Sequence, residues 1–141
     1  MILPDANTLL YAVNAAAPQH RLALRALEEG YLAPRGVAFA WAALLAFVRL
    51  STRAGIFPRA LSVEDALRVV SHWLGHPNAQ VVHPSEQHAQ VLGRLLRAAG
   101  TAGNLTSDAH LAALAIEHNA QIVSFDRDFA RFPEVRWTHP G

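Results

Sequence analysis

The sequence predicts an α/β protein with a mainly parallel central sheet, and three observations lead to this fold class. Short apolar runs alternate along the chain with longer segments of helical periodicity, which is the pattern of successive βα units. Hydrophobic residues make up 52% and charged residues 16% of the 141 residues, enough to bury a core within one domain. No repeat, low-complexity tract or linker divides the chain. We therefore expect a single domain spanning residues 1–141.

The N-terminal half is expected to hold two strands and four helices. The helix after the first strand is predicted by its apolar spacing, and the next helix should turn Leu22, Leu24 and Leu27 inward and end at Gly30. A later helix opens at Ser62, which has an acid three residues on, a variant of the capping box. A segment rich in glycine and proline precedes it and predicts a loop over 54–61. The expected bounds are strands at 1–4 and 37–39 and helices at 8–15, 19–29, 41–53 and 62–74.

The C-terminal half continues the alternation. Ser85 is expected to cap one helix, and Thr106 or Ser107 the next, whose left-handed exit suits Asn119. The expected bounds are strands at 79–82, 121–124 and 135–137 and helices at 85–99 and 107–118. The inner side of the first of these helices should carry Val91, Leu92, Leu95 and Leu96.

Composition excludes several classes of function. The chain has no cysteine, which excludes disulfides, thiolate zinc sites and cysteine nucleophiles and fits a cytoplasmic location. No signal peptide and no apolar run of about 18 residues is apparent, so we expect no membrane span. The net charge is only +1, although all twelve basic residues are arginines. Arginine suits phosphate contacts, but a biased coding composition would also remove lysine.

Carboxylates follow two predicted strands and open one predicted helix. Asp5 and Asp126 come directly after strands, and Asp108 lies at the start of an apolar helix. In a parallel sheet these positions gather at one edge, where a core needs no carboxylates. A hard divalent cation, Mg²⁺ or Mn²⁺, takes oxygen ligands and bridges to phosphate. The pattern therefore predicts a metal-dependent enzyme acting on a phosphate ester, with Asp128 as a further ligand or a supporting group.

Each carboxylate also has a structural alternative. Asp5 could be a helix cap, but Asn7 or Thr8 could serve instead, which favours a functional role for Asp5. Asn7 itself could cap the helix or hold a metal-bound water. Glu117 lies half a turn out of phase with Asp108 on the same predicted helix, so we expect it to face elsewhere and be solvated. His110 could approach a phosphate, although a half-buried structural histidine is the simpler interpretation.

The order and spacing of four motifs resemble the PIN-domain ribonucleases, in particular the VapC-type toxins of bacterial toxin–antitoxin pairs. The motifs cover essentially the whole chain: Ile-Leu-Pro-Asp-Ala-Asn-Thr-Leu-Leu-Tyr at 2–11, Trp41 with Leu-Leu-Ala-Phe-Val-Arg-Leu at 44–50, Gly-Asn-Leu-Thr-Ser-Asp-Ala-His-Leu-Ala-Ala-Leu-Ala at 103–115, and Ile-Val-Ser-Phe-Asp-Arg-Asp-Phe at 122–129. The resemblance implies a PIN-like three-layer α/β/α domain, and a Mg²⁺-dependent endoribonuclease for which Mn²⁺ is a plausible substitute. It also implies a homodimer and inhibition by a cognate antitoxin protein.

The resemblance carries the acidic site over as Asp5, Asp108 and Asp126, but one acid is missing. The family's further glutamate would fall near Ala46, and the chain has no acid between Glu29 and Glu64. Asp128 or Asn7 could compensate, whereas a second metal ion becomes doubtful. The missing acid motivates the alternative that the chain is a weakened or inactive PIN-fold module that binds RNA or protein.

The expected mechanism follows from the cation. Mg²⁺ held by the aspartates would polarise the scissile phosphate and activate a water for in-line attack. An arginine near the cleft would balance the developing charge, and Arg49, Arg53 and Arg127 are the candidates. Large side chains that could anchor an interface, although most should lie in the core, are Trp41, Phe47, Phe57 and Trp73.

A phosphatase of the haloacid-dehalogenase type is a weaker alternative. Its chemistry uses a second aspartate two residues after the first, and here that position is Asn7. It also uses a lysine to steady the phosphoryl group, and the chain has none.

Overall fold

Five strands form one sheet in the order β3-β2-β1-β4-β5, and every pairing in it is parallel. The computed structural model describes residues 1–55 and 57–141. The prediction of a mainly parallel sheet is confirmed, and the last strand begins two residues later than expected and ends one residue later. The strands are β1 (Ile2–Pro4), β2 (Val37–Phe39), β3 (Ala79–Val81), β4 (Gln121–Val123) and β5 (Trp137–Thr138).

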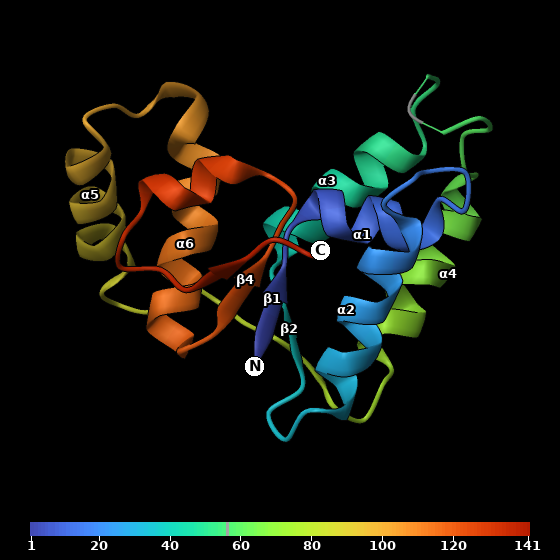
Figure 1. The fold of residues 1–141 in the computed structure, drawn as a ribbon, viewed down its shortest axis with the longest axis horizontal. Helices are drawn as coiled ribbons and strands as arrows, with labels where there is room; N and C mark the ends of the chain where they lie inside the picture. The colour runs from blue at the N-terminus through green and yellow to red at the C-terminus, as the bar shows by residue number, and fades with distance from the viewer. Residues whose placement is uncertain (56) are drawn as a thin grey trace.

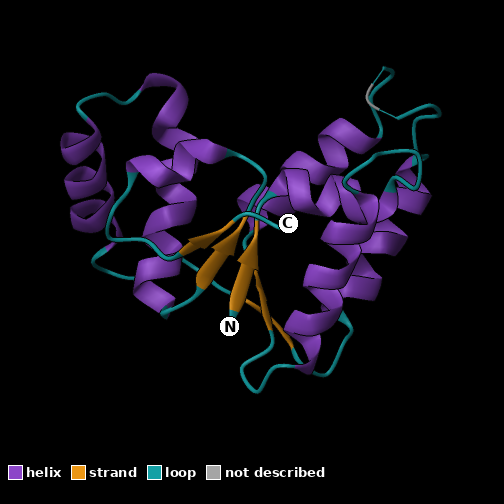
Figure 2. Ribbon diagram, viewed as in Figure 1, coloured by secondary structure: helices purple, strands orange, loops and turns teal. Residues whose placement is uncertain are grey.

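Helices cover both faces of this sheet, so the predicted three-layer α/β/α architecture is confirmed. Helices α1 to α4 lie on one side and α5 and α6 on the other (Figures 1 and 2). None of the helices in the described part is long and apolar enough to cross a membrane. The helices are α1 (Ala6–Val13), α2 (His20–Leu32), α3 (Trp41–Ser51), α4 (Val63–Leu74), α5 (His88–Ala99) and α6 (Thr106–His118), with short 3₁₀ helices η1 (Gly103–Leu105) and η2 (Arg127–Arg131).

The strands supply both halves of the core because successive side chains point to opposite faces of a sheet. Val37 and Phe39 are fully buried against α1 to α4. Leu3, Ala38 and Ile122 are fully buried against α5 and α6. The sheet therefore fixes where each helical layer sits and, with it, where the helix ends meet the strand ends.

Helix α1 begins earlier than predicted because Asp5 is its N-cap. The Oδ1 atom of Asp5 accepts a hydrogen bond from the backbone N–H of Ala6 at 2.8 Å. The expectation that Asn7 or Thr8 would cap this helix was wrong, since both lie inside its first turn with their side chains turned to β4. One residue thus starts the helix and presents a carboxylate at the sheet edge.

Helix α2 continues past Gly30, which the sequence had suggested as its end. A Cβ at position 30 would lie 2.5 Å from the Cδ1 atom of Ile2, so the glycine allows α2 to approach the sheet closely. Leu27 is buried as predicted. Leu22 and Leu24 are 37% and 38% exposed, so the expectation that they point inward was wrong.

The remaining helix ends agree with the sequence in part. Ser62 caps α4 by accepting the N–H of the residue three positions on at 3.1 Å, and Asn119 ends α6 in the left-handed region with φ 53°. Ser85 does not cap α5, because the chain makes a further turn before that helix begins. Neither Thr106 nor Ser107 caps α6, because η1 runs directly into it.

Candidate metal centre

The predicted acidic residues meet at the carboxyl-terminal edge of the sheet. Strand β1 lies between β2 and β4, and Pro4 pairs with Val123, so the residues that follow β1 and β4 are neighbours. Strands β2 and β3 extend the sheet to one side of β1, and β4 and β5 extend it to the other. This switch in strand order is the usual place for a site in an open α/β sheet. Helix α6 leads into β4, which is parallel to β1, and its first turn therefore brings Asp108 to the same edge.

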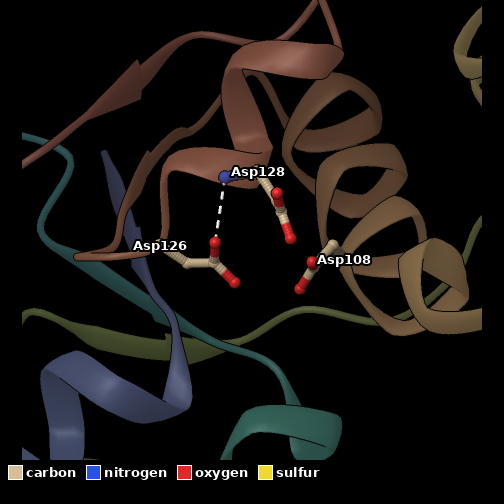
Figure 3. A group of neighbouring side chains, drawn as sticks. All are labelled: Asp108, Asp126 and Asp128. Atoms are coloured by element: carbon tan, nitrogen blue, oxygen red, sulfur yellow. Dashed lines mark hydrogen bonds between the residues drawn. The ribbon is translucent and has the colours of Figure 1, made fainter.

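Three carboxylates form a close group there. One oxygen from each of Asp108, Asp126 and Asp128 lies within 4.8 Å of the others, and Figure 3 shows the three side chains converging from α6, the loop after β4 and η2. The Oδ1 atom of Asp126 also accepts the backbone N–H of Asp128 at 2.9 Å, which starts η2 and fixes the spacing of the two acids. Asp128 therefore faces the same space as the other two carboxylates.

Asp5 lies beside this group and not within it. Its Oδ1 atom caps α1, and its Oδ2 atom accepts a hydrogen bond from the Oγ–H of Ser124 at 2.9 Å. Asp5 and Asp108 both line a cleft of about 500 Å³ between α1, α3 and α6. The four predicted acids thus surround one region, with Asp5 held on its β1 side.

The ionised forms of two of these acids are disfavoured by their surroundings. Burial, followed by the charges of Asp126, Asp5 and Asp128, raises the pKa of Asp108 from 3.8 to about 7. Burial also raises the pKa of Asp5, and the charge of Asp126 adds to this effect. Like charges held close together disfavour ionisation, so the fold keeps carboxylates here at an energetic disadvantage that a bound cation would remove.

A serine that sequence reasoning passed over ties the site together. Ser124 is completely buried at the end of β4, where its Oγ donates to Asp5 and accepts the backbone N–H of Asp126 at 3.0 Å. Asn7 donates to the same Oγ at 3.1 Å and accepts the N–H of Phe125 at 3.1 Å. The prediction that Asn7 caps the helix was wrong, because its side chain links α1 to the chain after β4. The available signal was a hydroxyl directly after the apolar pair Ile122 and Val123.

Helix α3 forms the opposite wall of the cleft and supplies no carboxylate. Its lining residues include Leu45, Ala46 and Arg49, so the position where the resemblance places a glutamate does face the cleft. Arg49 is exposed and is the one arginine that lines this cleft in the described part of the chain. The other two candidates, Arg53 and Arg127, are exposed or partly exposed and do not line this cleft.

Two further polar residues of α6 face α5 and not the cleft. Glu117 points away from Asp108 as predicted, but its side chain is only 4% exposed, so the expectation that it is solvated was wrong. It accepts the backbone N–H of Ser85 at 2.7 Å and pairs with the Nδ1 atom of His88. The Nε2 atom of His88 lies 2.9 Å from the Nδ1 atom of His110. This contact holds the imidazole ring of His110 between α5 and α6.

The donor set at the sheet edge suits a hard divalent cation. All the side chains that converge there offer carboxylate oxygens, with no histidine or cysteine in the group, and oxygen-only sites bind Mg²⁺, Mn²⁺ or Ca²⁺ in preference to zinc. The raised pKa of Asp108 supports the same assignment, because a bound cation would offset the burial and the neighbouring negative charges that disfavour its ionised form.

The sequence is similar to proteins of one family along its whole length. The family profile described as PIN domain matches residues 2–135. Ribonuclease VapC37 of Mycobacterium tuberculosis is 51% identical over 140 residues, covering 99% of this chain and 97% of that protein. Ribonuclease VapC33 of the same species is 39% identical over 140 residues, covering 99% and 98%.

Solved structures share the fold. VapBC-1 from nontypeable Haemophilus influenzae matches with a TM-score of 0.70 and 19% identity, covering 98% of this chain and 97% of that chain. Mycobacterium tuberculosis VapC20, described as a sarcin–ricin loop cleaving toxin, matches with a TM-score of 0.68 and 21% identity, covering 96% and 99%. The likeness at these identities concerns the arrangement of strands and helices.

Proposed function

The chain belongs to the PIN-domain family, among its VapC-type ribonucleases, and we propose that it is a Mg²⁺-dependent endoribonuclease, the toxin of a toxin–antitoxin pair. The observation that carries this proposal is the group formed by Asp108, Asp126 and Asp128, with Asp5 beside it. The 51% identity to a named ribonuclease over almost the whole chain supports the same activity.

We propose different roles for the four aspartates. Asp108, Asp126 and Asp128 would hold Mg²⁺ or Mn²⁺, and Asp5 would complete the negative wall on the β1 side. When bound, the cation supplies charge for the phosphate and acidity for a water molecule. A cation held there would favour the ionised form of Asp108, and Ser124 keeps Asp5 oriented through its 2.9 Å hydrogen bond. The phosphatase alternative lacks support, since Asn7 is occupied by Ser124 and the chain after it.

Cleavage of RNA by the purified chain tests this proposal. Wild type should cut a single-stranded RNA with Mg²⁺ or Mn²⁺ present and should lose this activity in EDTA. The Asp126→Asn variant should be inactive with either ion. The exposed Glu86→Gln variant is the matched control, since it removes a carboxylate remote from the cleft, and it should cut at the wild-type rate. Undiminished cleavage by Asp126→Asn would refute the assignment of the site.

Ala46 supports a second candidate, a PIN-fold module that binds RNA or protein without cutting it. The α3 wall carries this alanine and no carboxylate, so cation binding rests on the remaining acids. Titration calorimetry with Mn²⁺ separates the two functions, because an enzyme must bind the ion at millimolar concentration or below. Wild type that binds no Mn²⁺ but still binds RNA would favour the module.

A protein partner is part of the proposal. The structural neighbours include a toxin–antitoxin complex from Klebsiella pneumoniae, and we expect a cognate antitoxin to silence this chain, which would itself be a homodimer. A groove of about 830 Å³ between α2 and α4 offers apolar surface for such a partner, with Leu24 38% and Leu32 87% exposed. Growth arrest on expression, absent in Asp5→Asn and relieved by the antitoxin, is the cellular test; sedimentation gives the oligomeric state.

A further inference from the structure

The outer face of α3 carries an exposed row of unlike side chains beside the acidic cleft. Trp41 is 46% and Leu45 61% exposed, and Arg49 is also exposed. These residues are spaced four apart, so they follow one side of the helix over about 12 Å. We define Trp41, Leu45 and Arg49 as the α3 ledge.

The charge of the ledge complements the cleft. Leu45 and Arg49 line the cleft together with Asp5 and Asp108, so the cleft carries one basic residue opposite its acidic ones. Arg49 forms no ion pair with any carboxylate in the described residues, whereas Arg68 and Arg94 are each paired with an acid. Its guanidinium is therefore available for an anion, and its planar fork suits a phosphate.

Trp41, at one end of the ledge, is not packed into the core as the other large candidates are. The other large residues suggested as interface anchors, Phe47, Phe57 and Trp73, are at most 8% exposed, whereas nearly half of Trp41 is open to solvent. An exposed aromatic side chain on the same helix face as a cationic one is a combination that can hold unpaired bases by stacking and their phosphates by charge.

We infer that the α3 ledge is the binding track for single-stranded RNA leading into the cleft, with Arg49 on a phosphate next to the scissile one and Trp41 stacked on a base. This inference rests on the proposed ribonuclease function and assigns it two positioning residues. The ledge adjoins the acidic cleft through Leu45 and Arg49, as a track that delivers the substrate to the cleft must. The arginine in the row further favours a polyanion as the occupant.

Binding and cleavage are measured separately to test the ledge. Anisotropy of a labelled single-stranded RNA is recorded with the Asp108→Asn chain in Mg²⁺, so that the RNA stays intact. Adding Arg49→Ala should weaken binding about tenfold and lower the slope of log affinity against log salt by about one. Trp41→Ala should weaken binding about tenfold with the salt slope unchanged. Arg25→Ala, which removes an exposed arginine on α2 outside the cleft, should change neither quantity.

The other possible results distinguish failure of the ledge from failure of the ribonuclease function. If wild type cuts RNA but Arg49→Ala and Trp41→Ala bind as Arg25→Ala does, the ledge is refuted and the ribonuclease function stands. If wild type neither binds nor cuts RNA, both fail. If Trp41→Ala leaves RNA affinity intact but changes the sedimentation coefficient, the ledge belongs to a second copy of the chain. Circular dichroism of each variant should match wild type, because both side chains are exposed.

Discussion

Asp108→Asn should make the protein more stable at pH 8 and leave it nearly unchanged at pH 4. The pKa of Asp108 is about 7 in the folded chain against 3.8 ordinarily. Between these values the folded state binds more protons than the unfolded state, so the free energy of unfolding decreases as the pH rises. The penalty is absent below about pH 4 and complete above about pH 7. Asparagine has the same shape but no charge, and it removes this dependence.

The size of the effect follows from the two pKa values. A change from 3.8 to about 7 corresponds to about 4 kcal/mol at 1.36 kcal/mol for each tenfold change in proton affinity. Asp108 is only half-buried, so solvent screens the repulsion, and we reduce the expected gain to about 1–2 kcal/mol. A bound cation should reverse the order of stability, because 100-fold excess over the dissociation constant adds about 2.7 kcal/mol to wild type and less to the variant.

Urea unfolding in EDTA at pH 4 and pH 8, followed by circular dichroism, measures the difference directly. The comparison uses wild type, Asp108→Asn and Glu86→Gln, the last removing an exposed carboxylate and serving as the control. A difference in stability between wild type and Asp108→Asn that is the same at both pH values would show that folding does not raise the pKa of Asp108. Repetition at pH 8 with Mn²⁺ should place wild type above Asp108→Asn.

Three further predictions address the serine, the missing acid and the glycines. Ser124→Ala, which orphans the oxygen of Asp5 and a backbone N–H, should lower stability by about 1–3 kcal/mol and RNA cleavage at least tenfold; unchanged cleavage rates would contradict its positioning role. Ala46→Glu adds a carboxylate to the cleft wall and should tighten Mn²⁺ binding by calorimetry roughly tenfold, so unaltered affinity would count against this wall. Gly30→Ala should destabilise the fold by about 1–3 kcal/mol, since its Cβ would lie 2.5 Å from a side-chain carbon of β1. Gly93→Ala, which meets only the flexible end of an arginine at 3.0 Å, should stabilise by about 0.5–1 kcal/mol; urea unfolding that ranks the two alanines in the opposite order would refute this.

The local pattern of the sequence was sufficient for the fold class and for the place of the acids. Apolar runs of three or four residues predicted the strands because a buried strand needs only a short span. Acids directly after Pro4 and Phe125, and at the start of α6, predicted a site at the sheet edge because parallel strands end together. The strands and the meeting of the acids depend on residues close together in the chain, which is why the structure agrees with the sequence on both.

Tertiary structure decided which atoms meet. Ser124 and Asp5 are 119 residues apart, and only the pairing of β4 with β1 brings them within hydrogen-bonding distance. The burial of Glu117 required α5 to pack on α6, and the continuation of α2 through Gly30 required the close approach of β1. A sequence period reports that a face is buried but not what covers it, since any apolar or hydrogen-bonding neighbour satisfies the same pattern.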